Sequence, residues 1–133
     1  MSDFNTQIIE QYRNNNGELG ENFPFPVLLL HTVGKRSGEP RINPVAYQPE
    51  GDRFLVFASY GGAEQNPAWY HNLIAAPTAR VELPDGTFDV TVAELTGDER
   101  DRAYQAMAEK FGNFAEYETK TSRKIPVVAL TRS

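Results

Sequence analysis

Residues 27–48 read VLLLHTVGKRSGEPRINPVAYQ, and this stretch decides the fold. Its first seven residues are mostly apolar and suit a β-strand. Residues 34–38 form a polar segment bounded by two glycines, which is typical of a tight turn. Residues 41–48 then return to a strand-like pattern. We therefore predict two strands joined by a short turn, in antiparallel arrangement.

The segments outside this hairpin continue the same alternation of strands and turns. Further strands are predicted over residues 53–59, 79–83, 87–95 and 127–130, with turns at residues 49–52 and 84–86. Helices are predicted after the possible caps Ser2 and Asp3, from a cap at Asn66, from a capping box of Thr96 and Glu99 to about Phe111, and over about residues 113–119.

The order of these elements predicts a mainly β protein of the α+β type. Six strands joined by short hairpins form a mostly antiparallel sheet, and few helices interrupt it. A closed or half-closed barrel satisfies this pattern, and no strand–helix alternation with a glycine-rich fingerprint supports a Rossmann fold. We expect one domain over residues 1–133, in which residues 1–25 are an N-terminal helix and an extended lead-in.

Composition excludes several classes of function. The net charge of −5 argues against nucleic acid as the main partner, because phosphate binding requires a basic face. The absence of cysteine excludes disulfides and thiolate nucleophiles, and the two histidines lack metal-type spacing, so no metal is expected. No apolar run approaches the roughly 20 residues of a membrane span. We expect a cytoplasmic protein.

Membrane contact is a weaker alternative. The helical stripe of Phe4, Ile8, Ile9 and Tyr12 could lie on a membrane, but Arg13 is the only cation of this helix. Packing of the stripe at the mouth of the barrel is the favoured interpretation.

A cluster of cations occupies the turn of the first hairpin. Lys35, Arg36 and Arg41 flank Ser37 in an otherwise acidic chain. One interpretation is an anion site, to which backbone amides at the glycines would contribute further donors. The other is a solvated turn, because basic residues are common at hairpin tips. Both remain open on spacing alone.

Two other segments suit close approach of a ligand. Pro44 cannot donate a hydrogen bond, so its strand is irregular there or lies at an edge with free backbone groups. Residues 59–62 read SYGG and end a strand in a glycine loop. Trp69 and Tyr70 are more often core residues than ligand contacts. The aromatic residues near the C-terminus, including Phe114 and Tyr117, are either core or the lining of an open pocket.

Four motifs together resemble a known family. They are Gly34-x-x-Ser37-Gly38-x-x-Arg41-x-x-Pro44, Ser59-x-Gly61-Gly62, Asn66-Pro67-Ala68-Trp69-Tyr70-His71-Asn72-Leu73-x-x-x-Pro77, and Tyr117-x-x-x-Thr121-x-Arg123-x-Ile125-Pro126. Their order and spacing resemble the deazaflavin-dependent nitroreductase and quinone reductase family of actinobacteria, from about Leu28 to Leu130.

This resemblance implies a split β-barrel that binds coenzyme F420 and passes hydride from its reduced form to a small organic acceptor. The phosphate and glutamates of the cofactor tail would explain the basic turn. The implied cofactor-binding residues are Lys35, Arg36, Ser37, Arg41, Asn43, Pro44, Val45, Ser59, Tyr60, Gly61, Gly62, Pro67, Trp69 and Asn72. A non-catalytic store of F420 and a flavin mononucleotide-binding barrel are the alternatives, and the assembly is expected to be a monomer or a homodimer.

Two residues depart from the family pattern. Tyr60 stands where such proteins often carry lysine, which removes one cation from the tail site. Phe114 stands where the prodrug-activating nitroreductase has a tyrosine, so nitro reduction is in doubt while quinone reduction stays open. Phe114 and Tyr117 are expected to line the substrate pocket. Tyr117 and Ser59 are the candidate catalytic residues, as donors of a proton to the reduced acceptor.

Overall fold

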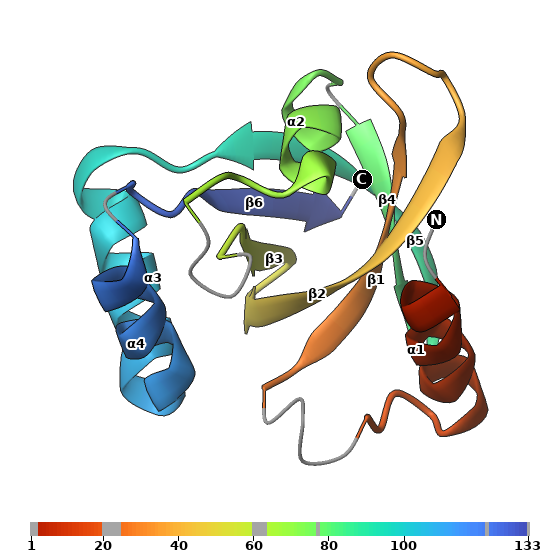
Figure 1. Cartoon of the computed structure of the whole chain (residues 1–133), viewed down its shortest axis with the longest axis horizontal. Coiled ribbons are helices and arrows are strands. Elements are labelled where there is room, and N and C mark those ends of the chain that lie inside the picture. Colours follow the sequence, from red (N-terminus) through yellow and green to blue (C-terminus); the bar gives the residue numbers. More distant parts are fainter. Residues whose placement is uncertain (1–2, 20–24, 60–63, 77, 122, 133) are drawn as a thin grey trace.

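The computed structural model describes residues 3–19, 25–59, 64–76, 78–121 and 123–132. Six strands close into a barrel in the order β1-β2-β3-β6-β5-β4, and every neighbouring pair is antiparallel (Figure 1). The strands are β1 (Val27–Val33), β2 (Pro40–Glu50), β3 (Arg53–Phe57), β4 (Thr78–Leu83), β5 (Gly86–Glu94) and β6 (Val127–Arg132). This arrangement confirms the predicted mainly β class and the six antiparallel strands.

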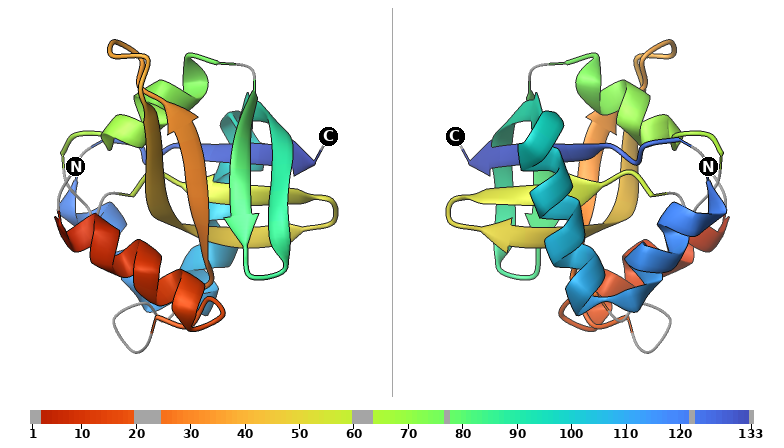
Figure 2. Two further views of the ribbon diagram at one scale, coloured as in Figure 1. Left: turned by 90° about the vertical axis from the view of Figure 1, so that its right-hand side faces the viewer. Right: turned by 90° about the vertical axis from the view of Figure 1, so that its left-hand side faces the viewer.

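Four helices surround the barrel. They are α1 (Asp3–Asn14), α2 (Ala68–Ile74), α3 (Gly97–Lys110) and α4 (Gly112–Lys120). Helix α1 lies at one side of the barrel and the pair α3–α4 at the other, as the two side views show (Figure 2). Helix α2 covers the barrel end that carries the tip of the first hairpin (Figure 1).

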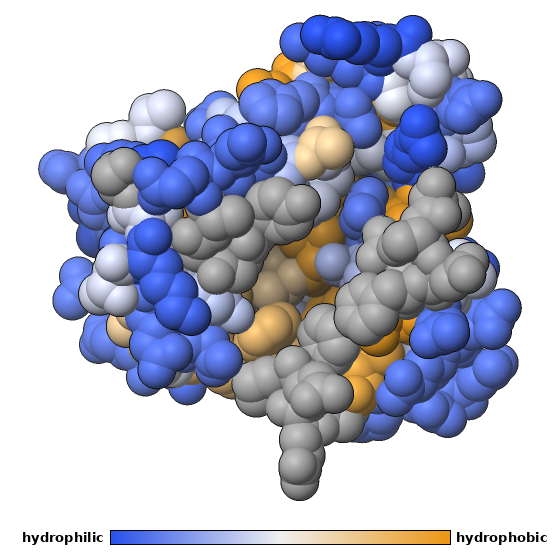
Figure 3. Space-filling model, viewed as in Figure 1, coloured by the Kyte–Doolittle hydropathy of each residue, from blue (hydrophilic) through white to orange (hydrophobic). Residues whose placement is uncertain are grey.

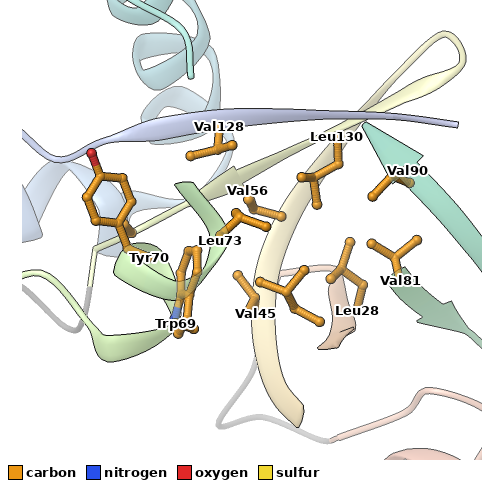
Figure 4. Packing of buried hydrophobic residues seen from close by; sticks show 12 residues of the cluster. Leu28, Val45, Val56, Trp69, Tyr70, Leu73, Val81, Val90, Val128 and Leu130 are labelled. Atoms are coloured by element: carbon orange, nitrogen blue, oxygen red, sulfur yellow. The ribbon is translucent and has the colours of Figure 1, made fainter. Parts of the chain in front are cut away.

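Alternate strand residues fill the barrel interior. Because successive side chains of a strand point to opposite faces, Leu28 and Leu30 of β1 point inward together. Trp69, Tyr70 and Leu73 of α2 pack onto the same cluster (Figure 4). The other members are Val45, Val56, Ala58, Val81, Val90, Val128 and Leu130. Helix α2 is therefore fixed by core packing at the barrel end.

The outer wall of the barrel carries a second core. Leu55 and Phe57 of β3 pack with Tyr104 and Met107 of α3 and with Phe114 of α4. The hydroxyl of Tyr104 donates a hydrogen bond of 2.7 Å to the carbonyl oxygen of Phe114. This bond ties the two helices together on the wall that they cover.

Helix α1 packs against the wall of the barrel rather than its mouth. Ile8, Ile9 and Tyr12 are buried against Val27 and Leu29 of β1. The Tyr12 hydroxyl donates to the carbonyl oxygen of Val27 at 2.8 Å. Three residues of the predicted apolar stripe therefore pack against the barrel. The side chain of the fourth, Phe4, lies outside the described residues.

A carboxylate fastens the last turn of α1. The guanidinium of Arg13 donates two hydrogen bonds of 2.8 Å to Glu82 of β4, which also contacts His31 at 3.0 Å. Hydrogen bonding from Arg13 is the main reason that the pKa of Glu82 is lowered.

Among the described residues no helix is long and apolar enough to cross a membrane.

The cap predicted for α2 is wrong, whereas Thr96 is the N-cap residue of α3 as predicted but lacks the side-chain bond of a capping box. Pro67, not Asn66, is the N-cap residue of α2, and the Asn66 side chain accepts a hydrogen bond from Arg123 instead. Thr96 does precede α3, but it makes no side-chain capping bond. The Glu99 carboxylate instead pairs with Arg53 of β3, with 3.1 Å between Arg53 Nη2 and Glu99 Oε2. In both cases a distant arginine competes with the local backbone for the same side chain.

Candidate functional site

The first hairpin extends beyond its neighbour β3. Residues 47–50 of β2 pair with β3, whereas residues 40–46 pair only with β1 among the described parts of the chain. The reason is length, because β3 has five residues and β2 has eleven. Pro44 lies in this overhanging part, which agrees with the expected strand edge.

A cleft of about 670 Å³ separates the overhanging hairpin from α2. This volume lies within the range of small-molecule and cofactor sites. The hairpin contributes Gly34, Lys35, Arg36, Ser37, Arg41, Ile42 and Asn43, and the helix contributes Ala68, Trp69, His71 and Asn72. We call this space the basic cleft.

Backbone hydrogen bonds shape the turn at the rim of the cleft. The amide of Gly34 donates to the carbonyl oxygen of Glu39 at 2.7 Å, and the Gly38 amide donates to the carbonyl oxygen of Gly34 at 3.0 Å. Ser37 Oγ accepts from the Glu39 amide at 3.2 Å. A Cβ at position 34 would lie 2.5 Å from this hydroxyl, and Gly38 has a φ of 72°. The backbone therefore favours glycine at position 38, and a side chain at position 34 would force the Ser37 hydroxyl to move.

One side chain joins this turn to α2. The Asn72 Oδ1 atom accepts a hydrogen bond of 2.9 Å from the backbone amide of Lys35. Asn72 thereby sets the width of the basic cleft at this end. Tyr70 holds the opposite side of the helix, because its hydroxyl donates to both carboxylate oxygens of Glu94 at 2.9 and 3.0 Å. Burial, with this carboxylate, raises the pKa of Tyr70 to about 12.

The rim of the cleft carries a local excess of positive charge. Lys35 and Arg36 are exposed and Arg41 is partly buried. The nearest acidic partner of Arg41 is Glu39, 4.0 Å away and largely exposed. A chain with a net charge of −5 thus places three cations around one opening. This arrangement favours the anion site over a merely solvated turn.

Asn43 and Trp69 give the cleft its interior surface. Asn43 lies on the overhanging part of β2, and Trp69 faces both the cleft and the barrel core. His71 also lines the cleft, although the sequence patterns did not single it out as a site residue. The sequence signal for His71 was its position four residues after Pro67, which places it on the exposed side of α2.

Four other expected cofactor residues are not part of the cleft lining. Pro44 is half-buried in β2, and Val45 is buried with its side chain in the barrel core. Pro67 is buried at the start of α2, and Ser59 is buried after β3. The remaining expected residues, Tyr60, Gly61 and Gly62, lie outside the described residues.

The space-filling view shows a hollow at the centre of one face, over β2 and β3, with hydrophobic side chains on its floor (Figure 3). A planar ring system would find an apolar surface there.

Phe114 is placed differently from the sequence expectation. Its side chain is 0% exposed and contacts Phe25, Phe57 and Tyr117 edge-on, with ring centroids 5.3–5.6 Å apart. In this structure the ring is therefore a core element between α4 and the barrel wall rather than the lining of an open pocket. The apolar environment of the wall competes successfully for an aromatic side chain that carries no polar group.

Tyr117 remains partly accessible. It lies one helical turn after Phe114 on α4, and burial is the main reason that the pKa of its hydroxyl is raised. The phenol is consequently protonated at neutral pH and able to donate.

We expect Phe114→Tyr to destabilise the protein by about 1–3 kcal/mol, because the new hydroxyl would enter a fully buried aromatic cluster. Urea unfolding gives the free energy. Phe111→Tyr is the matched control, since Phe111 is only half-buried at the start of the same helix. Equal stability of Phe114→Tyr and the parent would contradict the core placement and restore the pocket interpretation.

Sequence and structural comparisons agree with one another. Residues 5–132 match the family model described as F420H(2)-dependent quinone reductase. An F420H(2)-dependent quinone reductase of Mycobacterium tuberculosis (strain ATCC 25618 / H37Rv) is 40% identical over 126 residues, which are 91% of this chain and 85% of the relative.

Solved structures resemble the fold over most of its length. The F420-H2 dependent reductase FDR-A is 38% identical with a TM-score of 0.71, covering 79% of this chain and 93% of its own. A protein described as a domain-swapped dimer is 32% identical with a TM-score of 0.72, covering 97% of this chain and 99% of its own.

Proposed function

The chain belongs to the F420H(2)-dependent quinone reductase family, and we propose that its basic cleft is the binding site of the cofactor. It is an oxidoreductase that uses reduced coenzyme F420 and transfers hydride to a small organic acceptor. The cleft between the cation-rich turn and α2 is the observation that carries the proposal. Family membership favours F420 over flavin mononucleotide and catalysis over storage.

The residues present fit this cofactor. Its tail carries a phosphate and glutamates, and Lys35, Arg36 and Arg41 offer charge-assisted donors at one rim. The Ser37 hydroxyl adds a neutral donor there. A polyanion would gain little from such a turn if it were isolated in solvent, but here Asn72 holds the turn against α2. The site is therefore ordered before the ligand arrives, which lowers the entropic cost of binding.

The overhanging part of β2 would bind the ring system. Residues 43–45 pair with β1 but have no β3 neighbour in the described pairing, so the backbone groups that face away from β1 are available for a ligand. Trp69 supplies an apolar wall beside them. When bound, the reduced deazaflavin supplies the hydride.

Acceptor reduction also requires a proton. A hydride added to a quinone leaves negative charge on oxygen, and a nearby donor lowers the barrier. Tyr117 is the partly accessible phenol of α4, and Ser59 is buried two residues after the end of β3. We assign proton donation to Tyr117 first, because its side chain is partly exposed whereas Ser59 is buried.

The acceptor is a quinone in this proposal, by the names of the family and of its relatives. The domain-swapped dimer formed by one relative supports the homodimer over the monomer among the two expected assemblies.

The decisive experiment is oxidation of reduced F420 by a soluble quinone. We expect the absorbance of oxidised deazaflavin to return only when the purified protein and the quinone are both present. Reduced flavin mononucleotide serves as the control donor and should give no enzyme-dependent rate. Tight binding of F420 without turnover on any quinone would contradict the enzyme and support the storage alternative.

A further inference from the structure

A single arginine bridges two segments beside the cleft. Arg123 lies between α4 and β6, and its Nη2 donates to the carbonyl oxygen of Ser59 at 2.9 Å. Its Nη1 donates to Asn66 Oδ1 at 2.7 Å. Ser59 follows β3, and Asn66 precedes α2, so one guanidinium spans the two ends of residues 60–65.

The local backbone aims this side chain. The Arg123 amide donates to Thr121 Oγ1 at 3.3 Å, and Thr121 is itself buried at the end of α4. Such a short-range hydrogen bond from a backbone amide to a threonine hydroxyl shapes the turn that leads out of a helix. Arg123 is half-buried, and burial lowers the pKa of its guanidinium. Placing a cation there has a cost that its hydrogen bonds must offset.

The two acceptors need an arginine rather than a lysine. The guanidinium is a planar fork whose separate nitrogens reach separate acceptors, whereas the lysine ammonium is a single point on a flexible stem. Asn66 leads through Pro67 directly into the helix that carries Trp69. The two hydrogen bonds of the fork therefore tie the residue before α2 to the segment after β3, in addition to the core packing of the helix.

The bridge lies at the opposite end of α2 from the basic turn. Asn72 ties the C-terminal half of the helix to Lys35, whereas Asn66 stands before its first residue. Asn72 lies four residues beyond Ala68, the first residue of α2, which is a helical rise of about 6 Å, and Asn66 lies two residues before Ala68. If the anionic tail binds at the basic turn, the ring lies toward the end that Arg123 holds.

We propose that Arg123 is a positioning residue for the ring end of the cofactor. It acts through Ser59 and Asn66, fixing α2 and the end of β3 at the spacing that the ring requires. This inference rests on the proposed function of the basic cleft. It assigns the residue no contact with the cofactor and no role in the anion site.

The test compares two ligands. One is full F420, and the other is a deazaflavin that lacks the phosphate and glutamates. We expect Arg123→Ala and Arg123→Lys to weaken the binding of both ligands by the same factor. The expected loss is about 10-fold or more, which is the range for a lost hydrogen bond to a charged group. Arg41→Ala should weaken only full F420. Asn66→Ala removes one acceptor of the fork, and it should weaken the binding of both ligands as the Arg123 variants do.

Arg100→Lys is the matched control. Arg100 is a buried residue of α3 that holds the segment between α4 and β6 by donating twice to the carbonyl oxygen of Ile125, at 3.0 and 2.7 Å. We expect it to lower the free energy of unfolding and to leave both affinities unchanged. Added guanidinium should restore part of the affinity of Arg123→Ala for both ligands.

Three outcomes would overturn the proposal. Unchanged affinity of the Arg123 variants for the tail-less deazaflavin would remove the positioning role. An equal loss of affinity in Arg100→Lys would make the effect a general one of stability. Failure of the parent chain to bind F420 at all would overturn the proposed function, and that result is distinct from the first two.

Discussion

Arg41→Ala and Lys35→Ala are each expected to weaken binding of F420 by about 1–3 kcal/mol, or roughly 5- to 150-fold. Each change removes a charge-assisted donor from the rim of the basic cleft. Arg41 is the less exposed of the two, and we expect the larger loss there because solvent screens it less. Fluorescence titration with F420 measures the affinity directly.

Arg80→Ala controls for a general effect of removing positive charge. Arg80 is exposed on β4 and pairs with Asp89 at 3.0 Å, and it does not line the basic cleft. We expect its affinity for F420 to equal that of the parent. Both rim variants should also lose less affinity as salt is added, because the screened charge is already missing. Parent-like binding by Arg41→Ala and Lys35→Ala together would place the anion site elsewhere.

Tyr117→Phe is expected to slow acceptor reduction by about 10²- to 10⁴-fold, the usual contribution of a general acid, with little change in affinity for F420. The reason is that the hydroxyl would donate to the acceptor while the ring keeps its packing on Phe114. Steady-state rates on one quinone, with cofactor affinity measured alongside, decide this prediction.

The pH profile offers an independent check on Tyr117. Burial raises the pKa of this phenol above its ordinary value of 10.0, so the donor is present at neutral pH and is lost only as pH rises through that higher value. A parent rate that is flat through neutral pH and falls in strong alkali is expected. Ser59→Ala tests the second candidate donor. Parent-like rates in both Tyr117→Phe and Ser59→Ala would mean that water supplies the proton.

The local elements of this protein could be predicted from the sequence. The turn at residues 34–38 is marked by two glycines, and the structure shows why glycine suits both positions. The strands of the first hairpin were predicted within two residues of their observed ends. These features depend on backbone sterics and on alternation of side chains, which neighbouring residues specify by themselves.

The side-chain capping bonds could not be predicted in the same way. Asn66 and Glu99 are good capping residues by local chemistry, yet each is bound by an arginine from a distant part of the chain. A charged donor makes a stronger hydrogen bond than a backbone amide, so it takes the side chain when the fold brings it near. Which arginine comes near is decided by strand order and not by local sequence.

The candidate site divides along the same line. The basic turn and the family motifs could be read from residue types and their spacing, because charge and hydrogen-bonding capacity belong to the residues themselves, and the cofactor class followed from the resemblance that these motifs carry. The tertiary structure decided that Asn72 and Trp69 face that turn across a cleft, that Phe114 lies in the core, and that Arg123 bridges Ser59 and Asn66. These facts depend on closure of the barrel, in which a short β3 leaves the first hairpin overhanging and α2 packs on the open end. Contacts between segments far apart in sequence follow from how the whole set of apolar faces is buried at once, and no single stretch of the chain encodes that packing.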